Sequence, residues 1–157
     1  MINRILIKKS AADILVSETL KFKKLETGGV LSGYYEKDFL IIDSVSGPGP
    51  NAHHQVDEFI IDKEYMDLYL DQQYRDSDGQ NIYIGEWHTH PQEAPAPSEQ
   101  DLVSIAERTI EWKHGAIAFM IIGFVGFELE RLPSQSIAIA FHPGKQAFYK
   151  IPIKYER

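Results

Sequence analysis

The chain has 157 residues, 43% of them hydrophobic, which is enough for one domain with a buried core. Its 16 basic and 23 acidic residues give a formal net charge of -7, which argues against nucleic acid as the main partner. Cysteine is absent, and this excludes disulfides, a thiolate nucleophile and cysteine-ligated zinc or iron–sulfur sites. Any soft-metal chemistry must therefore use histidine and carboxylate ligands.

The first half of the chain has patterns that indicate two helices and several strands. Ser10 is the expected N-cap of the first helix, which has basic residues in its last turn. A hairpin that turns near Lys37 follows, and a Gly-Pro-Gly-Pro-Asn loop comes after it. The predicted elements are a helix over 10–24, strands over 30–35, 38–46 and 58–61, and a helix over 62–76.

The second half contains the clearest helical pattern, over residues 98–113, where apolar residues recur at i, i+3, i+4, i+7 and i+8. A strand over 81–90 and a loop with three prolines precede this helix. Strands are predicted after it over 116–124, 127–132, 136–141 and 147–155. This order predicts a single domain over 1–157, of α+β or α/β type, with a sheet between helices.

The stretch from His88 to Asp101 carries the most informative pattern. Residues i and i+2 of a strand point to the same face, so His88 and His90 can converge on one point and form half of a zinc site. Asp101 falls in the first turn of the next helix, where the positive helix end keeps a carboxylate ionised, as a metal ligand needs. Three protein ligands with a fourth position left for water are typical of catalytic zinc.

Each part of this pattern also has an explanation without a metal. A His-x-His pair in a strand is often two half-exposed residues, and Ser98-x-x-Asp101 before an apolar helix is first of all a capping box. A capping serine can also donate to a reacting oxygen, so the two roles are compatible. The joint spacing favours the metal site, because five fixed residue types arise by chance about once in three million windows.

A zinc site that activates water also needs a base, and the sequence offers Glu26, Glu86 and Glu93. Glu86 lies two residues before His88 on the same face of the strand, so it is a candidate base, additional ligand or partner of a ligand. Glu93 is expected in solvent. Glu26 lies at a helix-to-strand junction beside two glycines that permit close backbone approach and positive φ, although by itself it is only an acid at a helix end.

Other conspicuous residues have structural interpretations. His53 and His54 are expected in a polar loop, solvated or in contact with substrate rather than in a second metal site. Trp87 alternates with the histidine face and is predicted to pack in the core. The longest apolar stretch, 115–127, is below the roughly 18 residues that a membrane span needs. Since no targeting segment is recognised, we expect a cytoplasmic protein without a membrane partner.

These residues together resemble the JAMM motif of the JAB/MPN metalloprotease family. Every position of that motif is present, and the resemblance spans nearly the whole chain. It implies a single JAB/MPN domain with a twisted mixed sheet flanked by helices, of the cytidine-deaminase-like type. It also implies one Zn²⁺ ion per chain, a base that activates water and a donor to the oxyanion. The residues that match are Glu26 with Gly29-Val-Leu-Ser-Gly33, the ligands His88, His90 and Asp101, and the oxyanion donor Ser98, with Glu26 as the base.

The family cleaves peptide or isopeptide bonds after the C-terminal glycine of ubiquitin-like proteins, so the resemblance implies a zinc-dependent isopeptidase or peptidase. Residues 46–53 and 85–91 look similar to those of stand-alone bacterial members associated with CBASS anti-phage operons. Those members deconjugate a nucleotidyltransferase after a ubiquitin-like transfer catalysed by a partner with E1- and E2-like domains. The resemblance therefore implies a conjugated protein substrate, with a nucleotidyltransferase and an E1/E2-like transferase as partners.

Three alternatives stand beside this interpretation. A sulfur-carrier protease would release a small amine from the C-terminal glycine of a carrier protein. A non-catalytic MPN module would act as an assembly scaffold, although such modules have usually lost part of the ligand set. A nucleobase deaminase shares the broad fold but needs a Pro-Cys-x-x-Cys ligand pair, which a chain without cysteine lacks. Glu86 also departs from many eukaryotic members of the family, which carry an aromatic residue there.

Overall fold

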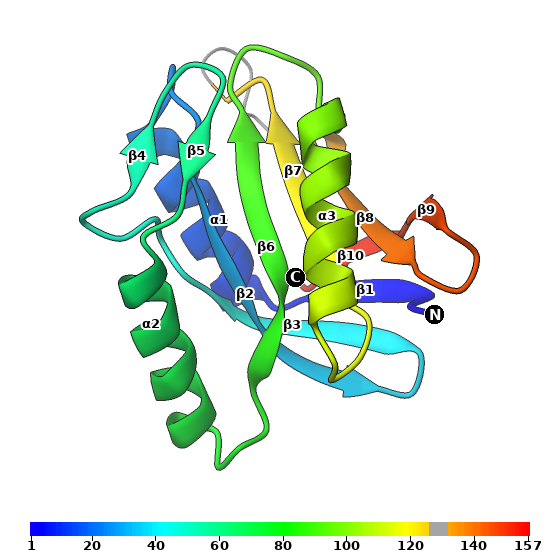
Figure 1. Cartoon of the computed structure of the whole chain (residues 1–157). Coiled ribbons are helices and arrows are strands. Elements are labelled where there is room, and N and C mark those ends of the chain that lie inside the picture. The colour runs from blue at the N-terminus through cyan, green and yellow to red at the C-terminus, as the bar shows by residue number, and fades with distance from the viewer. Residues whose placement is uncertain (126–131) are drawn as a thin grey trace.

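A computed structural model describes residues 1–125 and 132–157, and it shows a curled eight-stranded sheet with helices packed on both faces (Figure 1). The strands of this sheet are β1 (Arg4–Ile7), β2 (Gly28–Glu36), β3 (Phe39–Val45), β6 (Ile82–His90), β7 (Ala118–Gly123), β8 (Ser136–His142), β9 (Ala147–Lys150) and β10 (Ile153–Tyr155). The helices are α1 (Lys9–Lys21), α2 (Lys63–Asp76) and α3 (Glu99–Glu111), with a 3-10 turn at Leu132–Ser134. A separate hairpin consists of β4 (His53–His54) and β5 (Phe59–Ile60).

The main sheet mixes parallel and antiparallel pairs in the order β10-β1-β3-β2-β6-β7-β8-β9. β1 runs parallel to β3 and β10, and β6 runs parallel to β7, whereas the other neighbours are antiparallel. β9 and β10 follow each other in the chain but lie at opposite edges of the sheet. The sheet must therefore curl, so that the chain can pass from one edge to the other.

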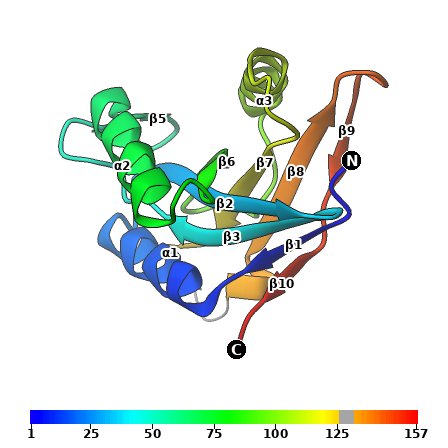
Figure 2. The same ribbon diagram turned by 90° about the horizontal axis from the view of Figure 1, so that it is seen from below.

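Figure 2 shows α1 and α3 on opposite faces of the sheet, and each of these faces carries a hydrophobic core. Side chains alternate between the faces along β7, as the pleat of a strand requires, so that Met120 belongs to one core and Ile121 to the other. The larger core lies on the α1 side and includes Ile7, Leu15, Leu31, Ile42, Trp87 and Met120. The smaller core lies on the α3 side and consists of Ile105, Ile117, Phe119, Ile121, Ile139 and Phe141.

Most of the predicted elements are confirmed. The α+β arrangement of a sheet between helices is present, and the first hairpin turns at Lys37, whose φ is 59°. Asp62 caps α2 by accepting a hydrogen bond from the main-chain N–H of Tyr65, and α3 begins directly after Ser98. Trp87 is 1% exposed and packs in the larger core, as predicted.

The predicted first helix is present, but its predicted N-cap and its predicted end are wrong. The first helix begins at Lys9 with Lys8 as the N-cap, no side chain caps it, and it ends at Lys21. Ser10 is not the cap, because the chain stays extended as far as Lys8, whose N–H donates to the main-chain oxygen of Ile42. The preceding strand β1 was not predicted, since four residues are too short for a clear pattern, although Ile5 and Ile7 are fully buried.

Two further predictions need correction. The strand expected over 147–155 is two strands, because Pro152 has no N–H to continue the ladder and marks the point where the chain changes edges. His53 and His54 lie in a strand rather than in a loop. The strand expected over 127–132 falls outside the described residues, except for Leu132, which begins the 3-10 turn. Within 1–125 and 132–157, no helix has the length and apolarity that crossing a lipid bilayer requires.

Candidate metal centre

The C-terminal end of β6 presents two imidazoles to the α3 side of the sheet. His88 and His90 lie two residues apart on this strand, and their Nε2 atoms are 3.2 Å from each other. β6 is held between the antiparallel neighbour β2 and the parallel neighbour β7, so its end is a rigid support. The geometry agrees with the expectation from the His-x-His spacing.

The first turn of α3 brings a carboxylate to the same point. Ser98 is the N-cap, and its Oγ accepts a hydrogen bond of 3.1 Å from the main-chain N–H of Asp101. The Asp101 Oδ2 atom in turn accepts a 2.9 Å hydrogen bond from the main-chain N–H of Ser98, which completes the predicted capping box. The capping box therefore fixes the rotamer of Asp101 and the direction in which its carboxylate points.

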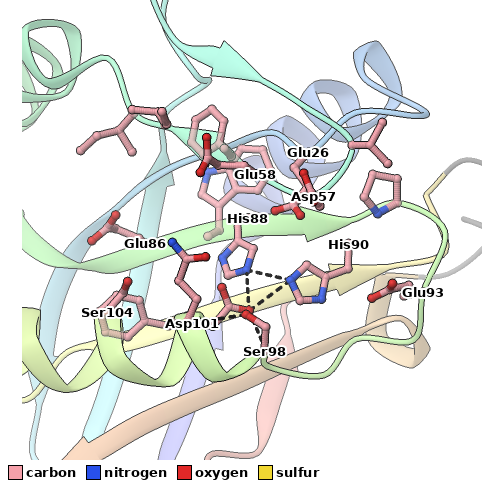
Figure 3. A pocket seen from close by; sticks show the side chains of 18 of the residues that line it. Glu26, Asp57, Glu58, Glu86, His88, His90, Glu93, Ser98, Asp101 and Ser104 are labelled. Atoms are coloured by element: carbon pink, nitrogen blue, oxygen red, sulfur yellow. Dashed lines mark hydrogen bonds and ion pairs between the residues drawn. The ribbon is translucent and has the colours of Figure 1, made fainter.

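Three potential ligand atoms form a small triangle (Figure 3). The Oδ2 atom of Asp101 lies 3.3 Å from His88 Nε2 and 3.1 Å from His90 Nε2, and the two nitrogens are 3.2 Å apart. Ligands of a tetrahedral ion are about 1.63 bond lengths apart, so bonds of about 2.0–2.1 Å to zinc require separations of about 3.3–3.4 Å. The triangle is thus close to one face of a zinc tetrahedron.

The electrostatics of the triangle favour an ionised carboxylate. Burial works to raise the pKa of Asp101, but hydrogen bonds from His88, His90 and the Ser98 main chain outweigh it and hold this pKa well below its usual range. Burial works to lower the pKa of His90, and the Asp101 carboxylate reverses this and raises it. The centre is therefore an anionic point between two imidazoles, which is the charge pattern that a divalent cation needs.

Glu26 completes the group from a different part of the chain. Its carboxylate lies with the nitrogens of His88 and His90 in a cluster whose ligand atoms are all within 4.8 Å of one another. Glu26 is 9% exposed, and burial raises the pKa of its carboxyl while the two histidines work to lower it. The structure therefore brings together all five residues that the sequence singled out: Glu26, His88, His90, Ser98 and Asp101.

The segment after Glu26 is tied to β6 at close range. The main-chain N–H of Thr89 donates to the oxygen of Thr27, and the N–H of Thr27 donates to Thr89 Oγ1 at 3.0 Å. Gly28 is opposite His88, and a Cβ there would collide with the main-chain oxygen of Trp87. The expectation of close backbone approach at the glycine pair is thus confirmed, whereas neither glycine has the positive φ that we also considered.

The other two candidate bases have different surroundings. The Oε2 atom of Glu86 accepts hydrogen bonds of 2.9 Å from Tyr83 and from Arg108 Nε, and burial raises the pKa of its carboxyl. Glu86 thus shares the face of His88 but is paired with α3 rather than with the triangle. Glu93 is exposed, as expected.

A cavity of about 610 Å³ opens above the triangle. The β4–β5 hairpin overhangs one side of it, and we call residues 53–60 of this hairpin the flap. The opposite wall is α3, with Asp101, Ser104 and Arg108. A second cavity of about 520 Å³ between α2 and α3 shares Ile61, Glu86 and Arg108 with the first, so the two meet at these residues.

Sequence reasoning missed the contribution of the flap and of Arg108. His54 was expected in solvent or against a substrate, but its ring stacks on Phe22 with centroids 3.8 Å apart. Arg108 was read only as part of a helix, although its charge is needed to pair Glu86. The available signal was the position of Glu86, two residues before His88 on the same face of the strand. An acid that is covered at such a position needs a basic partner.

Comparisons with known proteins bear on the fold and the family. Residues 8–133 match the family Prok-JAB, described as prokaryotic homologs of the JAB domain. The solution structure of protein DSY2949 from Desulfitobacterium hafniense matches with a TM-score of 0.69 and 17% identity, over 98% of this chain and 93% of that chain. At this identity the structural match shows a shared fold.

Curated relatives carry names that describe peptide-bond chemistry. "Probable metalloprotease y4qB" of Sinorhizobium fredii is 31% identical over 86 residues, which is 54% of this chain and 52% of that protein. A CD-NTase/cGAS isopeptidase of Vibrio cholerae is 26% identical over 132 residues, 80% of this chain and 82% of that protein. A protein of the same name from Escherichia coli is 31% identical over 119 residues, 67% of this chain and 64% of that protein.

These relatives differ in how much of their length is matched, from about half for the Sinorhizobium protein to about four fifths for the Vibrio protein. The family match, in contrast, extends over most of this chain, from the start of the first helix to the 3-10 turn before β8. The chain therefore belongs to the family of prokaryotic homologues of the JAB domain.

Proposed function

We propose that the protein is a zinc-dependent isopeptidase that hydrolyses the bond joining the C-terminal residue of a ubiquitin-like protein to an amine. The observation that carries this proposal is the triangle of His88, His90 and Asp101 with the Glu26 carboxylate beside it. The names of the relatives, metalloprotease and isopeptidase, support the same chemistry.

The donor set fits a zinc ion. Two imidazole nitrogens and one carboxylate oxygen are ligands that Zn²⁺ accepts, and the side of the triangle that faces the cavity leaves a position free. Asp101 is ionised and held by the capping box, so little rearrangement is required for binding. When bound, the ion supplies Lewis acidity, which lowers the pKa of a coordinated water towards about 7 and polarises a carbonyl.

Glu26 is the proposed base and acid of the reaction. Its carboxylate accepts a proton from the attacking water, whose oxygen forms the new bond to the carbonyl carbon. The carbon–nitrogen bond then breaks, and Glu26 delivers the same proton to the leaving amine. Burial favours the protonated form of Glu26, which makes its carboxylate a better proton acceptor in the first step.

Ser98 is the proposed donor to the carbonyl oxygen. Its Oγ already accepts a hydrogen bond from the N–H of Asp101, so the hydroxyl hydrogen remains available for donation. Negative charge that develops on the carbonyl oxygen is stabilised by such a preorganised donor, and loss of one donor costs about 10²–10³ in rate.

The substrate that we propose is a nucleotidyltransferase of a bacterial CBASS anti-phage system, conjugated through a ubiquitin-like C-terminal linkage. The names of three relatives, CD-NTase/cGAS isopeptidase, support this choice. The flap supplies a suitable surface, because β5 has no strand neighbour other than β4 among the described residues, and an extended tail can add at its outer edge as a further strand. Val56 and Ile60 at the rim of the cavity are 69% and 49% exposed, and a docked protein would cover them.

The test is hydrolysis of a defined conjugate. We would incubate the protein with a CD-NTase joined by an isopeptide bond to a lysine, and in parallel with a sulfur-carrier protein whose C-terminal glycine is linked to a small amine. We expect cleavage of the first substrate, loss of cleavage with a chelator, and recovery with one equivalent of zinc. Cleavage of the second substrate alone would move the assignment to a sulfur-carrier protease.

Undiminished cleavage after the metal has been removed would overturn the zinc proposal. An inert protein that binds no zinc would favour a scaffold module instead. Metal content by mass spectrometry separates that outcome from a wrong choice of substrate, because a catalytic site retains about one zinc per chain even when the tested conjugate is not cleaved.

A further inference from the structure

The main chain of Glu26 is attached to the flap on both sides of the residue. The N–H of Glu26 donates to the main-chain oxygen of Gln55 at 2.7 Å, and the oxygen of Glu26 lies 3.0 Å from Nδ1 of His54. A carbonyl can only accept, so this second contact requires the proton of the His54 ring to be on Nδ1. Two consecutive flap residues therefore hold the residue that we propose as the base.

The His54 ring is itself fixed by aromatic neighbours. It stacks on Phe22, the C-cap of α1, with centroids 3.8 Å apart and planes 9° from parallel. Phe59 of β5 also contacts the ring, in a tilted arrangement with centroids 5.4 Å apart. The ring is therefore held between the end of α1 and the second strand of the flap, which leaves it little freedom to turn away from Glu26.

The flap also reaches the cavity. His54 pairs with Phe59 across the hairpin, and Gln55 donates from its N–H to the main-chain oxygen of Glu58. The next residues along the hairpin, Val56 to Phe59, line the cavity above the triangle (Figure 3). A displacement of the flap by a bound molecule would thus be transmitted through residues 54 and 55 to the main chain of Glu26.

The other residues of the site do not depend on the flap in the way that Glu26 does. Asp101 is held by its own helix cap, and the histidines are held within the central part of the sheet. Glu26 lies between α1 and β2, in neither a helix nor a strand. From these contacts we propose that His54 is a positioning residue, which places the Glu26 carboxylate over the triangle by holding the flap against the main chain of Glu26.

The proposal rests on the proposed role of Glu26 as the base. Two substitutions of His54 separate its ring stack on Phe22 from its hydrogen bond to the oxygen of Glu26. His54→Phe keeps the stack on Phe22 but removes the hydrogen bond to the oxygen of Glu26. His54→Asn removes the stack, while its amide N–H₂ occupies nearly the position of Nδ1 and keeps the donor. His114→Phe is the matched control, since His114 is exposed, also contacts an aromatic ring (Trp112), and lies outside the flap and the cavity.

We expect kcat of the His54→Phe protein to fall about 10- to 100-fold with KM changed less than about twofold, because a shift of the base by about 1 Å costs up to about 10² in rate. His54→Asn should restore at least part of this loss, and His114→Phe should behave as the unmodified protein. Zinc content should be the same in all four proteins. A purely structural role would lower the melting temperature of the His54 variants without this split between kcat and KM, and that result would overturn the proposal.

Amide hydrogen exchange gives a readout that does not depend on turnover. The N–H of Glu26 should exchange about tenfold faster in His54→Phe than in His114→Phe, while the N–H of Asp101 is unchanged. Equal exchange at Glu26 in the two proteins would overturn the proposal even if activity fell. If no conjugate is cleaved by the unmodified protein, the proposed function fails, whereas the attachment of Glu26 to the flap is still decided by this exchange measurement.

Discussion

The two sides of the candidate metal centre are built in different ways. The side that carries His88, His90 and Asp101 comes from one continuous segment, the end of β6 and the start of α3. The side that carries Glu26 is assembled from the segment before β2 and from the flap, which are far apart in the sequence. The first side is rigid by local structure, whereas the second depends on contacts between distant segments.

This difference separates two requirements of the proposed reaction. An ion needs ligands whose separations are fixed to a few tenths of an ångström, and a strand end beside a helix cap supplies such separations. A base that must accept a proton and then deliver it to a different atom benefits from a support that can follow the substrate. Substitutions on the two sides should therefore have different signatures in metal binding and in turnover.

The largest effect is expected at Asp101. Asp101→Asn should retain the hydrogen bond from the Ser98 main chain but lose the negative charge, so zinc content should fall to near zero. Turnover should fall at least about 10⁴-fold, because without the ion the attacking water keeps a pKa of about 15.7 rather than about 7. Zinc analysis and single-turnover cleavage check this. An Asn variant with full zinc content would show that the imidazoles bind the ion without the carboxylate.

Glu26→Gln should affect turnover without affecting metal content. Loss of the proposed base should lower kcat about 10³-fold, within the range of general acid–base catalysis. Zinc should stay at one equivalent, since the triangle does not include Glu26. A parallel loss of zinc would instead make Glu26 a fourth ligand, which its place in the same cluster as His88 and His90 allows.

Ser98 has a role in both folding and the proposed reaction, and the choice of substitution separates them. Asn caps a helix about as well as Ser, so Ser98→Asn should keep α3 stable while it removes the hydroxyl donor. We expect kcat to fall about 10²-fold in both Ser98→Asn and Ser98→Ala, with a further loss of about 1 kcal/mol of stability in Ser98→Ala alone. If Ser98→Asn turns over normally, the hydroxyl serves the helix cap and not the reaction.

The metal-free protein offers a test of the buried charge on Glu26. Burial raises the pKa of this carboxyl in the folded state above its unfolded value, so ionisation costs stability at pH values above the folded pKa and costs nothing below the unfolded one. With chelator present, Glu26→Gln should therefore melt at a higher temperature than the unmodified protein at pH 7. This difference should disappear as the pH falls to about 4. A difference that is independent of pH would mean that packing, and not charge, is responsible.

The contrast between the two sides also explains what the sequence could predict. His88, His90, Ser98 and Asp101 are close in sequence, so strand periodicity and helix capping were enough to place them together. Glu26 was one of three candidate bases, and only the resemblance to a family selected it, because nothing local distinguishes an acid at a helix end from a base. The positions of His54 and Arg108 follow from tertiary contacts, with Phe22 and with Glu86, that no spacing in the sequence records.

The edge strands of the sheet were predicted least well, because they too depend on contacts between distant parts of the chain. β1 is a strand because Ile5 and Ile7 fill the core beneath α1 and pair with β3, which is a property of the assembled sheet. The division of the last strand at Pro152 was visible as a proline, but its consequence, the passage of the chain to the opposite edge, depends on the curl of the whole sheet.

Substitution of Glu86 should have the smallest effect. It also tests the contrast between the two sides of the site, because Glu86 lies on β6, in the side that carries His88 and His90. In the structure its Oε2 atom is occupied by Tyr83 and Arg108, and both donors can be served by the oxygen of a glutamine. Glu86→Gln should therefore keep full zinc content and change kcat by less than about threefold. The lost charge should not lower the unfolding free energy at pH 7, because burial outweighs the pairing with Arg108 and raises the pKa of Glu86, so that its ionisation costs stability. A loss of turnover as large as that of Glu26→Gln would transfer the role of base to Glu86 and place both catalytic functions on the rigid side of the site.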